Sequence, residues 1–153
     1  AFDDVNPQHK IYPARRGQNW QLLLPVYYKY KRYYMDEALY GYVIYSNSMS
    51  RGDTSEDKVL QRWNEHENIL LETINNIHMS EVEKEKYVHI IKKRYAEKRF
   101  YTAIDYKDKK RLKEEYEYIK ELKGETKALR DLYMRNEYRI CKIFYKVKAY
   151  IKQ

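Results

Sequence analysis

The sequence predicts a mainly α-helical chain whose first third is a small α+β segment. Two observations carry this prediction. All three prolines and three of the four glycines lie before residue 54, which indicates turns and irregular segments there. Residues 54–153 are rich in Glu, Lys, Arg and Leu and hold a single glycine, which is a helical composition. We therefore expect a domain boundary near residue 53, between segments 1–53 and 54–153.

The first 31 residues are expected to form an extended lead-in followed by a helix. Asn6-Pro7 and Tyr12-Pro13 predict the lead-in, because proline restricts its own φ and the residue before it. A helix from Asn19 to about Lys31 follows, since its apolar residues recur at helical spacing, with Pro25 as a site of kinking.

Two short strands are expected after this helix. Residues 33–35 and 39–45 are rich in Tyr and Val and alternate around the polar pair Asp36-Glu37. Residues 47–53 are polar and are expected to form a loop that leads into the helical part. The helix and the two strands together make up the α+β segment.

Two amphipathic helices are expected over residues 54–104. Asp53 and Thr54 are placed to cap the first, and Ser80-Glu81-Val82-Glu83 is a capping box that starts the second. The apolar residues expected on the buried face of the first helix are Leu60, Trp63, Leu70, Ile74 and Ile77. Those expected on the buried face of the second are Tyr87, Ile90, Ile91, Tyr95 and Ile104.

Residues 105–153 are expected to add two more helices. The polar run from Asp105 to Lys109 interrupts the pattern, and Gly124 is a natural helix-ending residue. Short links between successive helices predict an antiparallel hairpin or bundle. The expected core positions are Leu112, Tyr116, Ile119 and Leu122, then Leu129, Leu132, Tyr133, Ile140, Phe144, Val147 and Ile151.

The composition excludes several classes of protein. A lone Cys141 excludes a disulfide framework and a cysteine-rich zinc cluster, and it suits a reducing compartment. The apolar run from Leu22 to Tyr28 is far below the ~20 residues of a transmembrane helix, and no signal peptide is recognised at Ala1. The net charge of +8 is interleaved with acidic residues over 54–153, so a nucleic-acid partner is not expected.

Few motifs carry chemistry on their own. The four histidines are scattered, so a metal site is not expected. Asp3-Asp4 are adjacent carboxylates, the kind that hold a hard divalent ion, but a frayed acidic terminus is the favoured interpretation. Tyrosines alternate with cations over Tyr27 to Tyr34. They either pack as surface rings, which is favoured, or stack the bases of single-stranded nucleic acid.

Three segments that follow one another along the chain are more specific than these single motifs. They are Gly17-Gln18-Asn19-Trp20, residues 34–44 around Asp36-Glu37, and Asn47-Ser48-Met49-Ser50-Arg51. They resemble the end of the catalytic domain of bacterial family 2 glycosyltransferases. The resemblance implies an inverting sugar transfer from a nucleotide-sugar donor, on an A-type fold whose Asp-x-Asp motif holds Mg or Mn. Neither the nucleotide-binding half nor that motif precedes the match. We therefore expect the C-terminal region of such an enzyme, inactive by itself and without a cofactor of its own, with residues 54–153 as its helical extension.

The resemblance also implies acceptor-side residues. Gln18, Asn19 and Trp20 would bind the acceptor through amide hydrogen bonds and ring stacking. The family often has an Asp base where Asn19 stands, and an amide cannot act as a general base at neutral pH. The base is therefore unknown, with Asp36 and Glu37 as the nearest candidates. The plainer alternative is that Gln18 and Asn19 cap the helix and Trp20 anchors it in the core.

The donor side and the location follow from the same resemblance. Arg51 would face the donor diphosphate. The acceptor would be a surface-polysaccharide or lipid-linked sugar, and the enzyme would be cytoplasmic, with the inner face of the membrane as a compatible place. Two alternatives stay open. One is a basic, Tyr-rich helical module for an anionic membrane or nucleic acid, motivated by Lys107 to Arg111, and the other is a helical surface for homo-oligomers.

Overall fold

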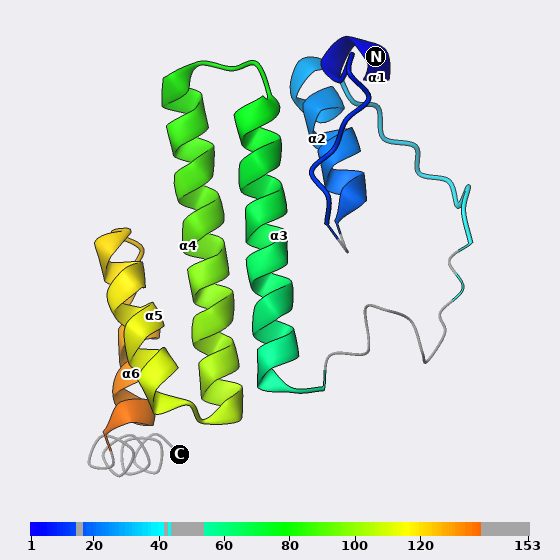
Figure 1. The fold of residues 1–153 in the computed structure, drawn as a ribbon. Helices are drawn as coiled ribbons and strands as arrows, with labels where there is room; N and C mark the ends of the chain where they lie inside the picture. The colour runs from blue at the N-terminus through cyan, green and yellow to red at the C-terminus, as the bar shows by residue number, and fades with distance from the viewer. Residues whose placement is uncertain (15–16, 42, 44–53, 139–153) are drawn as a thin grey trace. The chain divides into compact units, whose positions relative to one another are not determined.

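Six helices make up the secondary structure that the computed structural model describes (Figure 1). The structure describes residues 1–14, 17–41, 43 and 54–138. In chain order the helices are α1 (Phe2–Val5), α2 (Gln18–Lys29), α3 (Glu56–Asn76), α4 (Glu81–Tyr106), α5 (Lys109–Glu121) and α6 (Lys127–Glu137). The prediction of a mainly α-helical chain is confirmed. Within these ranges, none of the helices has both the length and the apolar character needed to cross a membrane.

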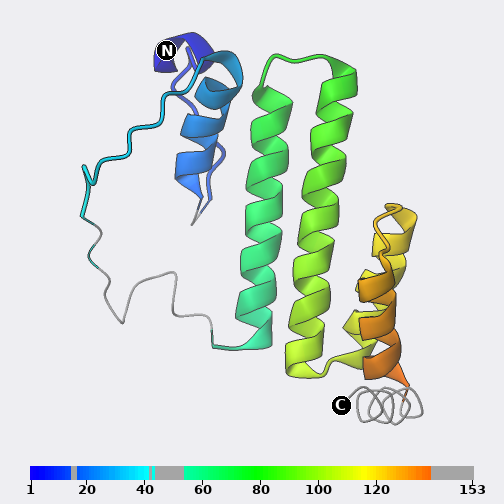
Figure 2. The same cartoon turned by 180° about the vertical axis from the view of Figure 1, so that it is seen from behind.

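The chain divides into two compact units, Ala1–Val88 and His89–Gln153. The first unit contains α1, α2, α3 and the first turns of α4, and the second contains the rest of α4 with α5 and α6 (Figure 2). The boundary expected near residue 53 falls within residues 44–53, outside the described part of the chain.

The prediction of two short strands is wrong. Residues 31–41 and residue 43 hold no strand. Residues 42, 44 and 45 and the whole of the polar loop expected over 47–53 lie outside the described residues. Tyr33, Tyr34 and Tyr40 are 80–88% exposed, so the segment has no apolar surface to pack on. A two-stranded hairpin without such packing is marginal in water, and β propensity alone does not order it. The expected α+β segment is, where described, helix followed by coil.

α2 confirms the helix expected from Asn19 to about Lys31. Its N-cap is Gly17, whose left-handed backbone (φ 75°) is a conformation that glycine adopts without steric cost. A Cβ on Gly17 would lie 3.0 Å from Cδ1 of Ile69, so the start of α2 lies directly against α3. The end of α2 lies beside the C-terminal turn of α3, and the two helices therefore run in the same direction (Figure 1).

α3 confirms the helix expected after residue 54, but its N-cap is Ser55 and not Asp53 or Thr54, the two caps that were predicted. Its buried residues are Leu60, Ile69, Thr73 and Ile74, followed by Ile77 at the C-cap. Three of these were predicted, whereas Trp63 and Leu70 are only half-buried. Ile69, which is 0% exposed, was missed because the adjacent Leu70 fits the helical spacing equally well.

The short helix α1 replaces part of the extended lead-in that was expected. Asp4 pairs with the Lys29 ammonium at 2.5 Å and accepts a hydrogen bond from the Tyr30 hydroxyl. These bonds lower the pKa of Asp4, and the bond from Lys29 is the largest cause. The interpretation of Asp3-Asp4 as a frayed terminus is therefore wrong for Asp4, which ties α1 to the end of α2.

The predicted capping box at the start of α4 is confirmed. The Ser80 hydroxyl accepts from the Glu83 backbone N–H at 3.3 Å and donates to the Glu83 carboxylate at 3.0 Å. The expected apolar face of α4 is only partly right. Tyr95 is 3% exposed, but Tyr87 and Ile90 are 37% and 48% exposed. The other buried residues of α4, none of them predicted, are Ala96, Arg99, Phe100, Thr102 and Ala103.

α5 and α6 form the antiparallel hairpin expected from their short link. Asp108 caps α5 by accepting from the Arg111 N–H at 3.0 Å, at the interruption predicted between Asp105 and Lys109. The Lys109 ammonium, at the start of α5, donates to the Glu137 carbonyl at the end of α6 at 3.0 Å, which makes the pair antiparallel. The last helix was expected to reach Ile151. Residues 139–153 are not among the described residues, so this part of the prediction is untested.

The core of the second unit joins α4, α5 and α6. The Tyr116 and Tyr133 rings stack at its centre, with centroids 4.0 Å apart and planes 8° apart. Beside the core, Arg99 Nε donates to Glu115 Oε1 at 2.9 Å and ties α4 to α5. The core residues are Ala96, Phe100, Ala103, Leu112, Tyr116, Ile119, Leu129 and Tyr133.

Glu125, in the link between α5 and α6, is held in its ionised form. Its carboxylate accepts hydrogen bonds from the Arg130 guanidinium and the Tyr116 hydroxyl. These bonds, Arg130 first, lower the pKa of Glu125 to about 2. Burial and the bond to Glu125 raise the pKa of Tyr116 to about 12. The stability of the second unit therefore depends on two groups in contact. Glu125 loses its charge in acid, and Tyr116 loses its proton in alkali.

Glu125→Gln should remove the acid-sensitive contribution to stability. A lowered carboxyl pKa stabilises the fold above the ordinary value of 4.5, and this contribution is lost as the pH falls toward 2. The raised pKa of Tyr116 stabilises the fold below 10 and is lost as the pH rises toward 12. Thermal unfolding across pH should show the parent more stable than Glu125→Gln at pH 7, and the two converging at low pH. The exposed Glu121→Gln is the control, and a constant gap between parent and Glu125→Gln down to pH 2 would contradict the assignment.

Candidate functional site

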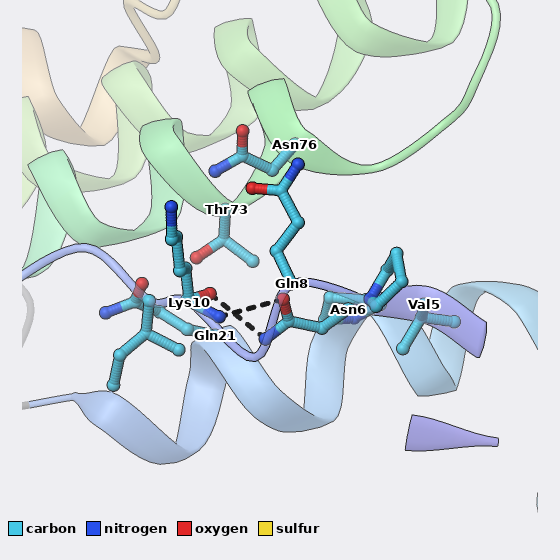
Figure 3. Close-up of a pocket in the computed structure, with 10 residues that line it drawn as sticks. Val5, Asn6, Gln8, Lys10, Gln21, Thr73 and Asn76 are labelled. Carbon is cyan, nitrogen blue, oxygen red and sulfur yellow. Dashed lines mark hydrogen bonds between the residues drawn. The ribbon is translucent and has the colours of Figure 1, made fainter. Parts of the chain in front are cut away.

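A cleft of about 270 Å³ opens in the first unit, where the segment after α1, the helix α2 and the C-terminal turn of α3 meet (Figure 3). Six of the described residues that line it are polar, and none of the described lining residues is a carboxylate. We call it the amide cleft. Its lining consists of Val5, Asn6, Pro7, Gln8, Lys10, Ile11, Gln21, Pro25, Thr73 and Asn76.

Two amides build the walls of the amide cleft. Gln21, which is 8% exposed, accepts from the Tyr12 N–H at 2.6 Å and donates to the Tyr12 carbonyl at 2.9 Å. Asn6 accepts from the Lys10 N–H at 3.2 Å and donates to the Lys10 carbonyl at 3.0 Å. A side-chain amide can pair with a peptide group in this way because it carries both an acceptor oxygen and an N–H₂ donor. Gln21 thereby holds the lead-in against α2, and Asn6 shapes the turn of the lead-in.

Three polar groups of the amide cleft are exposed to solvent and have no partner among the described residues, so they are accessible to a ligand. The amides of Gln8 and Asn76 and the ammonium of Lys10 make no hydrogen bond or ion pair in the described part of the chain. Gln8 and Lys10 extend from the lead-in toward α3, where Thr73 and Asn76 lie (Figure 3). The Thr73 hydroxyl donates to the Ile69 carbonyl at 2.6 Å and keeps its lone pairs for a further donor. The cleft therefore offers donors, acceptors and one positive charge.

The predicted acceptor residues lie outside the amide cleft, on the first turn of α2. Gln18 Nε2 donates to the Ala14 carbonyl at 2.7 Å, and Asn19 is exposed. The Trp20 indole meets the His66 ring edge-on, with 4.7 Å between centroids. No side chain caps α2, so the alternative in which Gln18 and Asn19 cap this helix is wrong. Trp20 is half-buried against α3.

The candidates for the catalytic base, Asp36 and Glu37, do not lie in this cleft, and the candidate contact with the donor diphosphate, Arg51, is not described. Asp36 and Glu37 are exposed in the coil after α2, and neither lines the amide cleft. Asp36 Oδ1 lies 3.4 Å from the Tyr34 hydroxyl. Arg51 falls outside the described residues. The described clefts therefore do not gather these residues with Gln18 to Trp20.

The residues 1–14, 17–41, 43 and 54–138 hold no group of three or more His, Cys, Asp or Glu that could bind a metal ion. The Asp3 carboxylate accepts a hydrogen bond from His9 Nε2 at 2.9 Å, and the Asp4 carboxylate is paired with the Lys29 ammonium of α2. The His66 ring packs edge-on against Trp20 and Trp63. No described residue is assigned to the Mg or Mn that the sequence resemblance implies, and that metal stays an expectation.

Sequence reasoning missed every residue of the amide cleft, although two of them carried a signal. Asn6 precedes Pro7, which is a turn signal, and its side chain makes the turn contact. Gln21 shares a helix face with Pro25, and both are buried. Gln8 and Asn76 carry no local signal, because they meet only once the lead-in has docked.

Comparisons with known proteins add no assignment. No protein-family model matches this chain, and neither a curated protein nor a solved structure matches it. The glycosyltransferase resemblance and the residue roles that it implies therefore stay predictions.

Proposed function

We propose that the first unit binds a sugar in the amide cleft, as the acceptor-side region of a glycosyltransferase. The observation that carries this proposal is the set of groups left for a ligand, which are the Gln8 and Asn76 amides and the Lys10 ammonium. The resemblance of Gly17 to Trp20 to the acceptor side of family 2 enzymes supports the same class of ligand from the sequence, while these residues themselves lie beside the amide cleft and not in it.

The lining of the amide cleft suits a single sugar ring. Each sugar hydroxyl both donates and accepts, and side-chain amides offer both functions at one place. Val5, Ile11 and Pro25 supply an apolar wall for the C–H face of a ring. The volume of about 270 Å³ lies just below the ~300–1,000 Å³ of small-molecule pockets, which favours one ring over an oligosaccharide. The positive charge of Lys10 favours a sugar that carries a carboxylate.

NMR titration of the full chain with monosaccharides tests sugar binding. We expect amide signals of residues 5–11 and 73–76 to shift with a hexose, an N-acetylhexosamine and a uronic acid, and the uronic acid to bind most tightly because of Lys10. Asn76→Ala should weaken binding by about twofold to tenfold, which corresponds to the ~0.5–1.5 kcal/mol of one hydrogen bond.

Asn75→Ala is the matched control, because Asn75 is the exposed neighbour of Asn76 on α3 and does not line the cleft. Equal binding by Asn75→Ala and Asn76→Ala would exclude Asn76 as a ligand contact. No shift of these signals with any of the three sugars at millimolar concentration would exclude the amide cleft as a sugar site.

The transferase part of the proposal depends on the sequence resemblance. It supplies the nucleotide-sugar donor, the contact of Arg51 with its diphosphate, and Asp36 or Glu37 as the base. We expect this chain by itself to transfer no sugar, which incubation with a panel of nucleotide sugars and acceptors measures. Transfer by the isolated chain would contradict that expectation and leave the sugar-binding test unaffected.

A further inference from the structure

A second cleft of the first unit is lined by aromatic rings and cations. It lies at the end of α2 and the start of the coil that follows, which Figures 1 and 2 draw in light blue to cyan, and its volume is about 600 Å³. We call it the tyrosine cleft, and it shares no lining residue with the amide cleft. Its lining consists of Val26, Tyr27, Tyr30, Lys31, Arg32, Tyr33 and Tyr34.

The two outermost rings of the tyrosine cleft are open to solvent. Tyr33 and Tyr34 are 88% and 82% exposed. A surface tyrosine that serves packing buries its ring and keeps only its hydroxyl in water. Surface packing, the favoured interpretation from the sequence, therefore fails for Tyr33 and Tyr34, whose ring faces are available to a planar ligand.

Two cations of the tyrosine cleft are available to an anion. Lys29 is engaged elsewhere, since its bond to Asp4 at 2.5 Å raises the pKa of Lys29. Lys31 and Arg32 form no ion pair with any residue of the described ranges. Arg32 Cζ lies 5.6 Å from the centroid of the Tyr27 ring, a cation–π contact that positions the guanidinium at the cleft. The described residues that line the cleft include two cations and no carboxylate, while Asp4 and Asp36 contact the lining through the hydroxyls of Tyr30 and Tyr34.

We propose that the tyrosine cleft binds single-stranded nucleic acid, with bases stacked on Tyr33 and Tyr34 and phosphates held by Lys31 and Arg32. Every base has a π-face and every nucleotide has a phosphate, so this combination binds strands without reading their sequence. A base-paired duplex does not fit, because its bases already stack on one another and do not present their faces.

An anionic membrane fits the tyrosine cleft less well. A bilayer is a continuous surface, and it would meet the exposed Asp36 and Glu37 together with the two cations, which cancels the attraction. A strand seated in the cleft meets the rings and the two cations. Glu37 is absent from the described lining, and Asp36 reaches the cleft only at the Tyr34 hydroxyl, from which it accepts a hydrogen bond at 3.4 Å. The net charge of +8 attracts either partner and does not decide between them.

Fluorescence anisotropy of a labelled oligouridylate with the full chain tests the proposal. Tyr33→Leu combined with Tyr34→Leu should weaken binding about tenfold or more, because leucine keeps an apolar surface but cannot stack a base. Tyr33→Phe combined with Tyr34→Phe should bind like the parent, because the rings remain. Lys31→Gln combined with Arg32→Gln should reduce the slope of log K against log salt by about 1.4, or ~0.7 for each phosphate contact on a single strand.

Lys113→Gln combined with Lys127→Gln is the matched charge control. Both residues are exposed, on α5 and α6, and the pair removes the same charge, so the salt slope should stay close to that of the parent. Circular dichroism checks that the helices of each variant are intact.

Four results would overturn the proposal. The first is no binding of the oligouridylate at low salt, and the second is equal binding by the leucine variant and the parent. The third is an equal fall in salt slope for the two charge variants, which would indicate diffuse attraction by the whole chain. The fourth is retention on phosphatidylserine vesicles that survives the leucine substitutions, which would assign this surface to a membrane.

Discussion

Phe100→Ala should unfold much of the second unit. Phe100 is 0% exposed, lies in the core that α4, α5 and α6 share, and has its ring centroid 6.3 Å from that of Tyr116. Truncating a buried phenylalanine to alanine costs about 3–5 kcal/mol, because apolar contacts are lost and a cavity is left. Domains are stable by only about 5–15 kcal/mol, and small units lie at the low end of this range.

Hydrogen exchange measures the effect of Phe100→Ala, because it reports the stability of each helix separately. We expect protection of the α5 and α6 amides to fall by about two orders of magnitude or more. Val82→Ala is the control, because Val82 lies on the same helix but is 78% exposed. Equal protection in the two variants would show that the Phe100 ring does not hold the three helices together.

Gln21→Leu should release the lead-in from α2 and open the amide cleft. Leucine is apolar, so the Tyr12 N–H and carbonyl both lose the amide that pairs with them at 2.6 and 2.9 Å. An unsatisfied, partly buried polar group costs about 1–3 kcal/mol, so we expect the free energy of unfolding to fall by about 2 kcal/mol. Exchange of the Tyr12 amide hydrogen should accelerate, and the sugar-induced shifts at residues 5–11 should disappear.

Two further variants isolate the role of the Gln21 amide. Asn19→Leu is the control, since it makes the same kind of change at an exposed position on the same helix. The free energy of unfolding of Gln21→Glu should lie between those of Gln21→Leu and Asn19→Leu. An ionised carboxylate still accepts a hydrogen bond from the Tyr12 N–H, but it has no hydrogen to donate to the Tyr12 carbonyl. Slow exchange of the Tyr12 amide in Gln21→Leu would show that the lead-in is held by other contacts.

The helices were predictable because their signals are local. The Ser80 capping box and the interruption before Lys109 lie at the observed helix starts. The Gly17 turn precedes α2, and α5 ends shortly before Gly124. Each of these signals acts over one turn of chain, and the sequence displays it directly.

The buried faces were less predictable, because burial depends on what lies opposite. In α4, Tyr87 and Ile90 fit the helical period but are exposed, while Ala96 and Ala103 are small and buried in the shared core. A periodic pattern identifies apolar positions, but it does not say which turn of a long helix meets a neighbour. For the same reason the pattern predicted Leu70 as buried on α3, whereas the structure buries the adjacent Ile69.

The sequence by itself determined the helical class of the described residues, the ends of most helices and the absence of a disulfide framework, since caps, breakers and composition are properties of the chain alone. Only the tertiary structure decided where ligands can bind. The amide cleft exists because docking of the lead-in brings Gln8 to Asn76, which lies far along the chain. The tyrosine cleft is open because Tyr33 and Tyr34 are 88% and 82% exposed, and residues 31–41, as far as the structure describes this segment, form coil where strands were expected.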